Sequence, residues 1–306
     1  MQPIDESYPE SFLIQGYTPP GKGHRGQVKR AVAAVNSSKK PVFFAGGGIN
    51  VGNSSEIFRK IIKKTNIPVV TSLMGIGALE TDNPLNLGMI GMHGTYAANR
   101  AVSECDLLFG IGVRFDDRAT GELDRFAPHA KIIHLDIDPA AIARNVPVEV
   151  PIVGDGYTVL KELFPLLEEI ERPEWISTIK NWKGEAVCIN AYEGFTAKIE
   201  DSSMLMPYEV LKQANKVFPD AIVTTEVGQN QMWTALFWNF KTPRTFITSG
   251  GLGTMGYGFP ASIGAAVACP DKRVVAVAGD GSFQMNLQEL ATAVKNRLPI
   301  VILILN

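Results

Sequence analysis

Short apolar segments alternate with segments of helical length along this 306-residue chain, and this alternation constrains the fold more than any other feature. Several of the apolar segments, such as VFFA, VVAVA and IVILIL, carry an apolar side chain at every position. A strand that is apolar on both faces is typical of a parallel sheet covered by helices on both sides. Strands that alternate with helices through right-handed crossovers predict an α/β architecture.

The same patterns predict where the individual elements lie. We expect strands at residues 41–45, 67–71, 106–111, 131–137, 151–153, 221–225, 273–278 and 300–305. Helical spacing and capping residues predict helices at 25–36, 53–65, 94–104, 207–218 and 285–296. A charged helix at 161–171 is expected next to a tryptophan-bearing helix that starts near Pro173.

The predicted fold class is α/β, with two parallel-sheet, Rossmann-like domains that carry helices on both faces. Residues 24–160 form the first predicted domain, residues 161–206 a helical connection, and residues 207–306 the second domain. Residues 1–23 hold prolines and glycines before any helical period begins, so we expect an incoming linker there. We expect the second domain to be truncated, because the apolar run 300–305 is followed by neither a covering helix nor a further strand.

The composition argues against several classes of partner. A net charge of −2 and a pI near 6.1 give no electrostatic basis for binding nucleic acid or an acidic membrane surface. No apolar run approaches the ~20 residues of a membrane-spanning helix, and the polar N-terminus is unlike a signal peptide. The 3 cysteines are widely spaced, which is typical of reduced thiols, so we expect a cytoplasmic protein, or an organellar one in a eukaryote.

Two Gly-Asp-Gly sequences follow apolar runs, but their contexts differ. Asp280 comes after the run 273–278, and Asn306 follows the next run. In a parallel sheet these side chains would lie at the carboxyl ends of strands, where oxygen ligands suit magnesium bound to a diphosphate. Asp155 has an asparagine at the same spacing downstream, Asn181, but in a polar helical segment. Because an Asx-type turn explains Gly-Asp-Gly alone better, the flanking strands carry the magnesium prediction.

Other glycine-rich or charged segments have both a ligand-binding and a structural interpretation. The segment 251–256 matches G-x-G-x-x-G, but the next acidic residue comes too soon for a dinucleotide fingerprint, so a ligand loop or a tight turn fits better. Residues 46–48 follow a strand and either offer backbone N–H groups to a phosphate or form an ordinary loop. RFDDR at 114–118 is explained by a surface ion-pair cluster, although its arginines also suit a phosphate.

Together these segments resemble the large catalytic subunits of the acetolactate (acetohydroxyacid) synthase family, which use thiamine diphosphate. The resemblance extends from about residue 20 onward and is most specific in GVRFDDRATG (112–121), VGQNQMW (227–233), TSGGLGTMGYG (248–258) and residues 279–293. It implies an enzyme that decarboxylates pyruvate and joins the two-carbon unit to a second 2-ketoacid, pyruvate or 2-ketobutyrate. The implied pathway is the biosynthesis of valine, leucine and isoleucine.

The resemblance also implies binding residues for thiamine diphosphate, Mg²⁺ and FAD. Asp280 is the implied magnesium ligand, with Asn306 as a further candidate. The implied thiamine diphosphate residues are Val227, Gly228, Gln229, Asn230, Gly253, Met255, Gly279, Asp280, Gly281, Ser282 and Met285. The implied residues for FAD, which is largely structural in this family, are Gly46, Gly47, Ser72, Leu73, Gly91, Met92, His93, Gly112, Arg114, Asp116, Arg118, Asp136, Ile137 and Asp155.

The chain departs from the family pattern in ways that bear on activity. Asn230 stands where the family usually has His, which leaves a role of that position in proton transfer or substrate placement open. The glutamate that activates thiamine belongs to an N-terminal domain that residues 1–23 are too short to supply, so no catalytic residue is assigned. The family's magnesium-binding Asn is the second of an Asn-Asn pair, of which Asn306 resembles the first. We therefore expect an internal fragment that is inactive by itself.

The parent enzyme is expected to be a homodimer or tetramer with a small regulatory subunit, and with neither nucleic acid nor membrane as partner. In the family the thiamine site forms between two chains. Two other interpretations stay open. One is another thiamine-diphosphate enzyme, such as glyoxylate carboligase or pyruvate oxidase, against which RFDDR and GQNQMW argue. The other is a stand-alone FAD- or nucleotide-binding module, which a stoichiometric yellow chromophore without thiamine dependence would favour.

Overall fold

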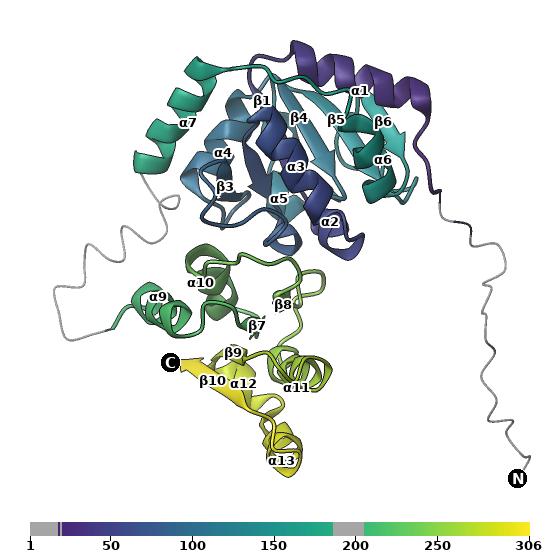
Figure 1. The fold of residues 1–306 in the computed structure, drawn as a ribbon. Coiled ribbons are helices and arrows are strands. Elements are labelled where there is room, and N and C mark those ends of the chain that lie inside the picture. Colours follow the sequence, from purple (N-terminus) through teal and green to yellow (C-terminus); the bar gives the residue numbers. More distant parts are fainter. Residues whose placement is uncertain (1–17, 19, 186–204) are drawn as a thin grey trace, which may run out of the picture.

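The computed structural model describes residues 18, 20–185 and 205–306, which form two parallel β-sheets with helices on both faces of each (Figure 1). This confirms the predicted α/β class with two parallel sheets. The first sheet has the strand order β3-β2-β1-β4-β5-β6. Its strands are β1 (Pro41–Ala45), β2 (Val69–Thr71), β3 (Asn86–Met89), β4 (Leu107–Ile111), β5 (Lys131–Asp136) and β6 (Val150–Val153).

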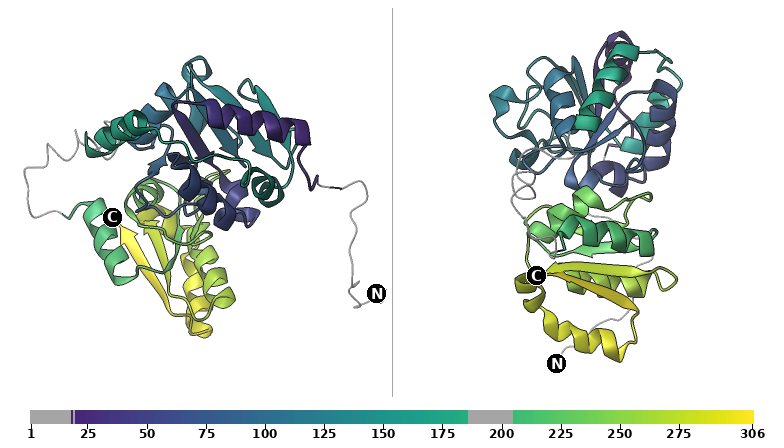
Figure 2. Two further views of the ribbon diagram at one scale, coloured as in Figure 1. Left: turned by 45° about the horizontal axis from the view of Figure 1, so that its top comes forward. Right: turned by 90° about the vertical axis from the view of Figure 1, so that its left-hand side faces the viewer.

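Helices cover the first sheet from both sides, because its strands bury side chains on both faces. One core packs α1, α3 and α6 against the sheet, and a second core packs α4 and α7 against the opposite face (Figure 2). The helices of this half are α1 (Arg25–Ser37), α2 (Gly47–Val51), α3 (Ser55–Thr65), α4 (Tyr96–Glu104), α5 (Asp117–Thr120), α6 (Gly156–Leu163) and α7 (Pro173–Glu185), with 3-10 turns η1 (Leu73–Gly75) and η2 (Leu123–Arg125).

The strand order changes direction between β1 and β4, and glycine backbones meet at this point. The Gly46 N–H donates to the carbonyl of Ile111 (2.9 Å), and the Gly48 N–H donates to the carbonyl of Gly112 (3.1 Å). A Cβ atom on Gly46 would lie 1.9 Å from the carbonyl oxygen of Gly112. Only glycine therefore permits this approach at the switch point, where open α/β sheets bind ligands.

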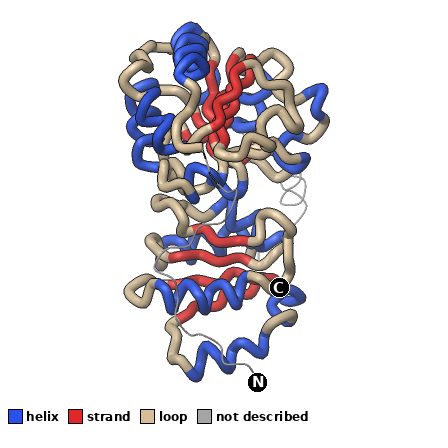
Figure 3. Tube along the Cα trace, turned by 90° about the vertical axis from the view of Figure 1, so that its right-hand side faces the viewer, coloured by secondary structure: helices blue, strands red, loops and turns tan. Residues whose placement is uncertain are grey.

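The second sheet is also entirely parallel, in the order β10-β9-β7-β8. Figure 3 shows its strands side by side in the lower half of the view. Its strands are β7 (Ile222–Thr225), β8 (Phe246–Thr248), β9 (Val274–Gly279) and β10 (Ile300–Leu305). The helices of this half are α9 (Pro207–Val217), α10 (Gln229–Phe237), α11 (Gly258–Ala268), α12 (Asp280–Gln284) and α13 (Leu290–Lys295), with the 3-10 turn η3 (Leu287–Glu289). Helices α9 and α10 pack on one face and α11 on the other.

Two expectations about local structure were wrong. The charged helix predicted at 161–171 does not form, because α6 ends at Leu163 and Pro165, which lacks an N–H, disfavours helical continuation. The helix predicted at 285–296 is divided into η3 and α13. The sequence patterns also missed the short strands β3 and β8.

Most of the predicted linker at 1–23 and part of the predicted connection at 161–206 lie outside the described residues, so those domain boundaries stay predictions. Within the described residues, no helix has the length and apolar character needed to cross a membrane.

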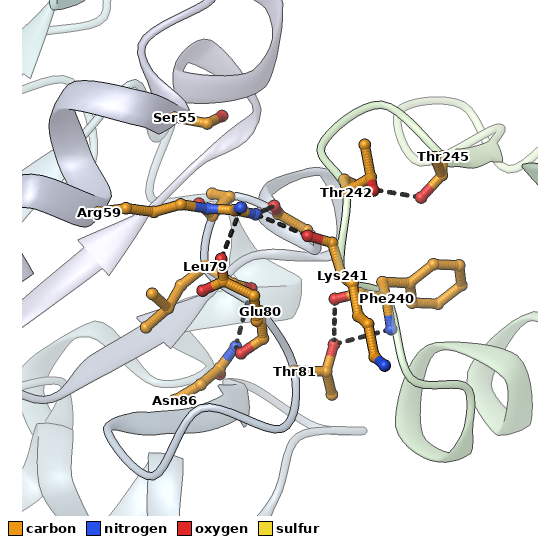
Figure 4. Close-up of polar contacts among 12 residues, drawn as sticks. Ser55, Arg59, Leu79, Glu80, Thr81, Asn86, Phe240, Lys241, Thr242 and Thr245 are labelled. Atoms are coloured by element: carbon orange, nitrogen blue, oxygen red, sulfur yellow. Dashed lines mark hydrogen bonds and ion pairs between the residues drawn. The ribbon is translucent and has the colours of Figure 1, made fainter. Parts of the chain in front are cut away.

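Arg59 of α3 connects the two halves of the molecule (Figure 4). Its guanidinium donates to the carbonyl oxygens of Ala78 (3.0 Å), Gly77 (2.9 Å) and, in the second half, Lys241 (2.9 Å). The same group forms an ion pair with Glu80 at 2.6 Å. One planar side chain thus holds the turn after β2 against the segment between α10 and β8.

Thr81 and Phe240 form a second polar link across this junction (Figure 4). The Thr81 hydroxyl accepts a hydrogen bond from the Phe240 N–H and donates to the Phe240 carbonyl, both at 3.1 Å. The Thr81 N–H also donates to that carbonyl at 3.0 Å. The two halves therefore meet through a defined set of backbone contacts.

Replacing Arg59 by Lys should weaken this junction. A lysine ammonium can still pair with Glu80 but lacks the planar fork that reaches several carbonyls at once. We expect the free energy of unfolding to fall by about 2 kcal/mol, measured by urea denaturation. The matched control is Lys60→Ala, since the ion pair of Lys60 with Glu56 one turn away is exposed on both sides and its loss should give no measurable change. Equal stability of R59K and the wild type would contradict the assignment.

Candidate functional site

The carboxyl edge of the second sheet collects all the residues implied to bind thiamine diphosphate. Because all strands of this sheet are parallel, the segments that follow them emerge at one edge. Val227, Gly228, Gln229 and Asn230 follow β7; Gly253 and Met255 follow β8; Gly279, Asp280, Gly281, Ser282 and Met285 end or follow β9; Asn306 follows β10. The structure thus brings together the three stretches implied to bind thiamine diphosphate and, with Asn306, a fourth segment.

The two Gly-Asp-Gly sequences have different structural roles. Asp155 is the N-cap of α6, and its Oδ1 accepts hydrogen bonds from the N–H (2.9 Å) and hydroxyl (2.8 Å) of Thr158. Asp280 is the first residue of α12 and is exposed, and its carboxylate makes no hydrogen bond or ion pair within the described part of the chain. The carboxylate of Asp280 is therefore available to a ligand, whereas that of Asp155 stabilises a helix terminus.

Asn306 lies beside Asp280 at the sheet edge. Strands β9 and β10 pair in parallel, with Leu305 opposite Gly279, so the next residues of the two strands are also neighbours. A carboxylate and an amide oxygen are hard ligands of the kind that magnesium takes together with phosphate oxygens. Among the described residues, no three His, Cys, Asp or Glu side chains gather as a metal site, so a cation here would rely on ligand oxygens for the rest of its shell.

Asn230 has a buried polar atom that points to a ligand. Its side chain is 4% exposed, and Oδ1 has no hydrogen-bond partner in the described residues. Its Nδ2 lies 3.5 Å from the position that a Cβ on Gly228 would occupy and 3.4 Å from the equivalent position on Gly279. The amide therefore sits between the loops after β7 and β9, where its Nδ2 could donate to a bound diphosphate and its Oδ1 could accept from a water or another donor group.

The glycine-rich loop after β8 is held at Gly256, whose φ of +87° is readily adopted only by glycine. The Gly256 N–H donates to Glu226 Oε2 (2.7 Å), and its carbonyl accepts from Asn286 Nδ2 (2.6 Å). The preceding residue, Met255, is 46% exposed at the sheet edge. The sequence patterns missed Glu226 and Asn286, although an acidic residue directly after the apolar run 221–225 was a signal that could have found the first.

The residues implied to bind FAD lie at the carboxyl edge of the first sheet, and every strand of that sheet contributes. Gly46 and Gly47 follow β1; Ser72 and Leu73 follow β2; Gly91, Met92 and His93 follow β3; Gly112, Arg114, Asp116 and Arg118 follow β4; Asp136 ends β5 and Ile137 follows it; Asp155 follows β6. This edge faces the second half, because Met74 of η1 lies against Gly250, where a Cβ would be 2.4 Å from the Met74 sulfur.

The RFDDR loop is held on its buried side by Phe115 and Asn145, and its two arginine side chains are exposed to solvent. Phe115 is 2% exposed and has a φ of +48°, which is unusual for a large side chain. Asn145 Nδ2 donates to the carbonyls of Arg114 and Phe115, both at 3.0 Å. The ion pairs Arg114–Asp116 (3.6 Å) and Arg118–Asp117 (3.9 Å) are long and exposed. Such weak pairs leave both guanidinium groups able to bind a phosphate.

Two histidines near this edge have lowered pKa values, which favours the neutral form of each ring. Partial burial, and then the charge of Arg118, lowers the pKa of His93. His134 is fully buried on β5, with its Nε2 2.8 Å from the Val113 carbonyl, and its Nδ1 has no partner in the described residues. Burial lowers the pKa of His134, against the opposing effects of the Val113 carbonyl and Asp136. A neutral ring with its proton on Nε2 fits these surroundings.

His134 should therefore make folding sensitive to acid. The unfolded chain takes up a proton below the ordinary histidine pKa of about 6.5, but the folded chain does so only at a lower pH. The free energy of unfolding should fall by up to about 1.4 kcal/mol per pH unit as the pH drops through this window. Urea denaturation across the window measures the slope. His134→Gln, which can still donate to Val113, should reduce it, and an unchanged slope would contradict the prediction.

Comparison with known proteins places both halves in one group of enzymes. Residues 28–163 match the family described as thiamine pyrophosphate enzyme, central domain. Residues 226–306 match the thiamine pyrophosphate enzyme, C-terminal TPP binding domain. These matches, and the relatives described next, confirm the family resemblance that the sequence motifs indicated.

The chain is also similar to curated acetolactate synthase subunits. It is 46% identical to the probable acetolactate synthase large subunit of Methanocaldococcus jannaschii over 97% of this chain and 50% of that protein. It is 43% identical to the probable large subunit of Methanococcus aeolicus over 97% of this chain and 51% of that protein. The large subunit of acetolactate synthase isozyme 3 of Escherichia coli is 42% identical over 98% of this chain and 52% of that protein. The chain thus spans about half the length of the curated relatives it matches.

The sheet-edge geometry, the two domain matches and these relatives agree with one another. The chain therefore belongs to the thiamine pyrophosphate enzymes, of which it carries a central domain and a C-terminal thiamine-pyrophosphate-binding domain, and along nearly all of its length it is similar to acetolactate synthase large subunits.

Proposed function

We propose that this chain forms the central and thiamine-binding parts of an acetolactate synthase catalytic subunit. The reaction is the decarboxylation of pyruvate and transfer of the two-carbon unit to a second 2-ketoacid, pyruvate or 2-ketobutyrate. The observation that carries the proposal is the meeting of Asp280, Asn306 and the unpartnered Oδ1 of Asn230 at one sheet edge. The relatives' printed names, which call them large subunits, support a smaller partner subunit.

Thiamine diphosphate, when bound, supplies the carbon nucleophile of this chemistry, and the chain's own residues hold its two ends. Asp280 and Asn306 are the residues that would hold magnesium, whose charge would favour binding of the diphosphate. Asn230 would donate to the diphosphate through its amide N–H and use its free Oδ1 toward a donor of the ligand or a water. Met255, exposed next to the fixed Gly256, would pack against the rings.

We also propose that FAD binds along the carboxyl edge of the first sheet. Support comes from the strand order, which switches between β1 and β4, and from the glycine backbones that meet there. The exposed guanidinium groups of Arg114 and Arg118 would bind the flavin diphosphate. The neutral His93 would contact the cofactor without adding charge.

Cofactor binding tests the site directly and does not require turnover. Calorimetric titration of the chain with thiamine diphosphate should give binding that needs Mg²⁺ and disappears with a chelator. Binding of FAD is read independently from flavin fluorescence. The product of the natural reading frame that contains these residues should form acetolactate from pyruvate. Binding of FAD without any magnesium-dependent binding of thiamine diphosphate would instead support a nucleotide-binding module.

A further inference from the structure

Glu226 is a buried carboxylate with both oxygens bound to backbone N–H groups. It follows β7 directly and is 1% exposed. Its Oε2 accepts from the Gly256 N–H at 2.7 Å, and its Oε1 accepts from the Phe259 N–H at 2.9 Å. Phe259 lies in the first turn of α11, where the helix dipole favours a negative charge. Such partners offset the cost of burying a carboxylate.

The loop that Glu226 holds is fixed from other directions as well. Asn286 Nδ2 donates to the Gly256 carbonyl at 2.6 Å. The backbone N–H and the carbonyl of Gly256 are therefore both hydrogen-bonded to side chains. A Cβ on Gly258 would lie 2.5 Å from the backbone nitrogen of Glu226, so the start of α11 packs directly on the end of β7. Gly256 thus connects the segments after β7, β8 and β9, which are the three stretches of the proposed thiamine site.

We propose that Glu226 is a positioning residue that sets where the loop carrying Met255 stands relative to the diphosphate end of the thiamine site. This inference rests on the proposed function. The side-chain hydrogen bonds of the Glu226 carboxylate go to Gly256 and Phe259, and not to Asp280 or Asn306 at the diphosphate end. Loss of Glu226 should therefore weaken the contacts with the thiamine rings but leave the binding of diphosphate and magnesium unchanged.

The test compares two ligands on the full chain by calorimetry: thiamine diphosphate and inorganic pyrophosphate, each with Mg²⁺. Glu226→Gln puts an NH₂ group against one of the two backbone N–H donors. We expect its affinity for thiamine diphosphate to fall about 10- to 100-fold, with pyrophosphate affinity within about twofold of the wild type. Glu226→Asp, which keeps the carboxylate, should recover part of the affinity. An unchanged affinity for thiamine diphosphate, or an equal loss for both ligands, would overturn the proposal.

Two further variants guard against a simple folding defect. Glu209→Gln is the matched control, because Glu209 accepts from the Met206 N–H at the start of α9, far from the loop in sequence, and should change neither affinity. Asn286→Ala removes the other bond to Gly256 and should reproduce the selective loss. If Asn286→Ala binds both ligands like the wild type, the loop is not held as proposed.

Hydrogen exchange separates this inference from the proposed function. In the cofactor-free chain, the amides of Gly256 and Phe259 should be protected in the wild type and exchange faster in Glu226→Gln. This readout needs no thiamine. Unchanged protection would therefore overturn the proposal that Glu226 holds the loop, whatever the chain binds. The opposite case is a wild-type chain that shows the expected exchange but binds no thiamine diphosphate. That result would overturn the proposed function, and with it the proposal that Glu226 positions the loop for this cofactor.

Discussion

Asp280→Ala should abolish magnesium-dependent binding of thiamine diphosphate while leaving the fold intact. Changes in the outer shell of a metal site cost about 10- to 100-fold in metal affinity, so loss of a direct carboxylate ligand should cost on the order of 100-fold or more. The carboxylate makes no bond within the described part of the chain, so the free energy of unfolding should change by less than about 0.5 kcal/mol. Calorimetry with and without Mg²⁺ measures the first effect, and urea denaturation the second.

The chain supplies a matched comparison in its other Gly-Asp-Gly sequence. Asp155→Ala removes the N-cap of α6 and should lower the free energy of unfolding by about 1 kcal/mol. It should leave the affinity for thiamine diphosphate unchanged, because Asp155 follows β6 of the first sheet and its carboxylate is bound to Thr158. The two variants therefore have opposite signatures. Thiamine diphosphate binding that survives in D280A would refute Asp280 as the magnesium ligand.

The main strands could be predicted from the sequence because each is a local run of apolar residues. Strands β1 and β10 have the predicted bounds, since each is an uninterrupted run of apolar residues; β1 is fully buried inside its sheet, and β10 is half-buried at the edge of the other. Strands β3 (NLGM) and β8 (FIT) were missed because they are short, and β3 contains polar and glycine residues. Their extended conformation depends on pairing with β2 and β7, which is a tertiary effect.

The position of the candidate site was predictable for a related reason. Parallel strands bring their carboxyl ends to one edge, so the residues after β7, β9 and β10 had to be neighbours once the sheet was inferred. The roles of Glu226 and Asn286 were not predictable. Each binds Gly256 across 30 residues of sequence, and these bonds depend on how the glycine-rich loop returns to the sheet. No local pattern encodes that path.

Trp238→Ala should destabilise the molecule more than any other single change considered. Trp238 is 1% exposed and stacks on Phe240, with ring centroids 6.4 Å apart. It belongs to a core that contains Val223 and Val275 of the second sheet together with Ile76 and Met89 of the first half. Truncating a buried tryptophan to alanine removes its apolar contacts and leaves a cavity, which costs about 3–5 kcal/mol. Urea denaturation measures the loss.

Because this core contains residues of both halves, the loss should reach both sheets. Hydrogen exchange of β4 and β9, measured by mass spectrometry, should show lower protection in both strands. If the core were formed by residues of the second half alone, only β9 would lose protection. Val217→Ala is the control: this apolar side chain of α9 is 67% exposed, so its truncation should stay within about 0.5 kcal/mol. If W238A loses less than about 1 kcal/mol, or loses protection only in β9, then Arg59 and Thr81 join the halves without a shared apolar core, and the two sheets unfold independently.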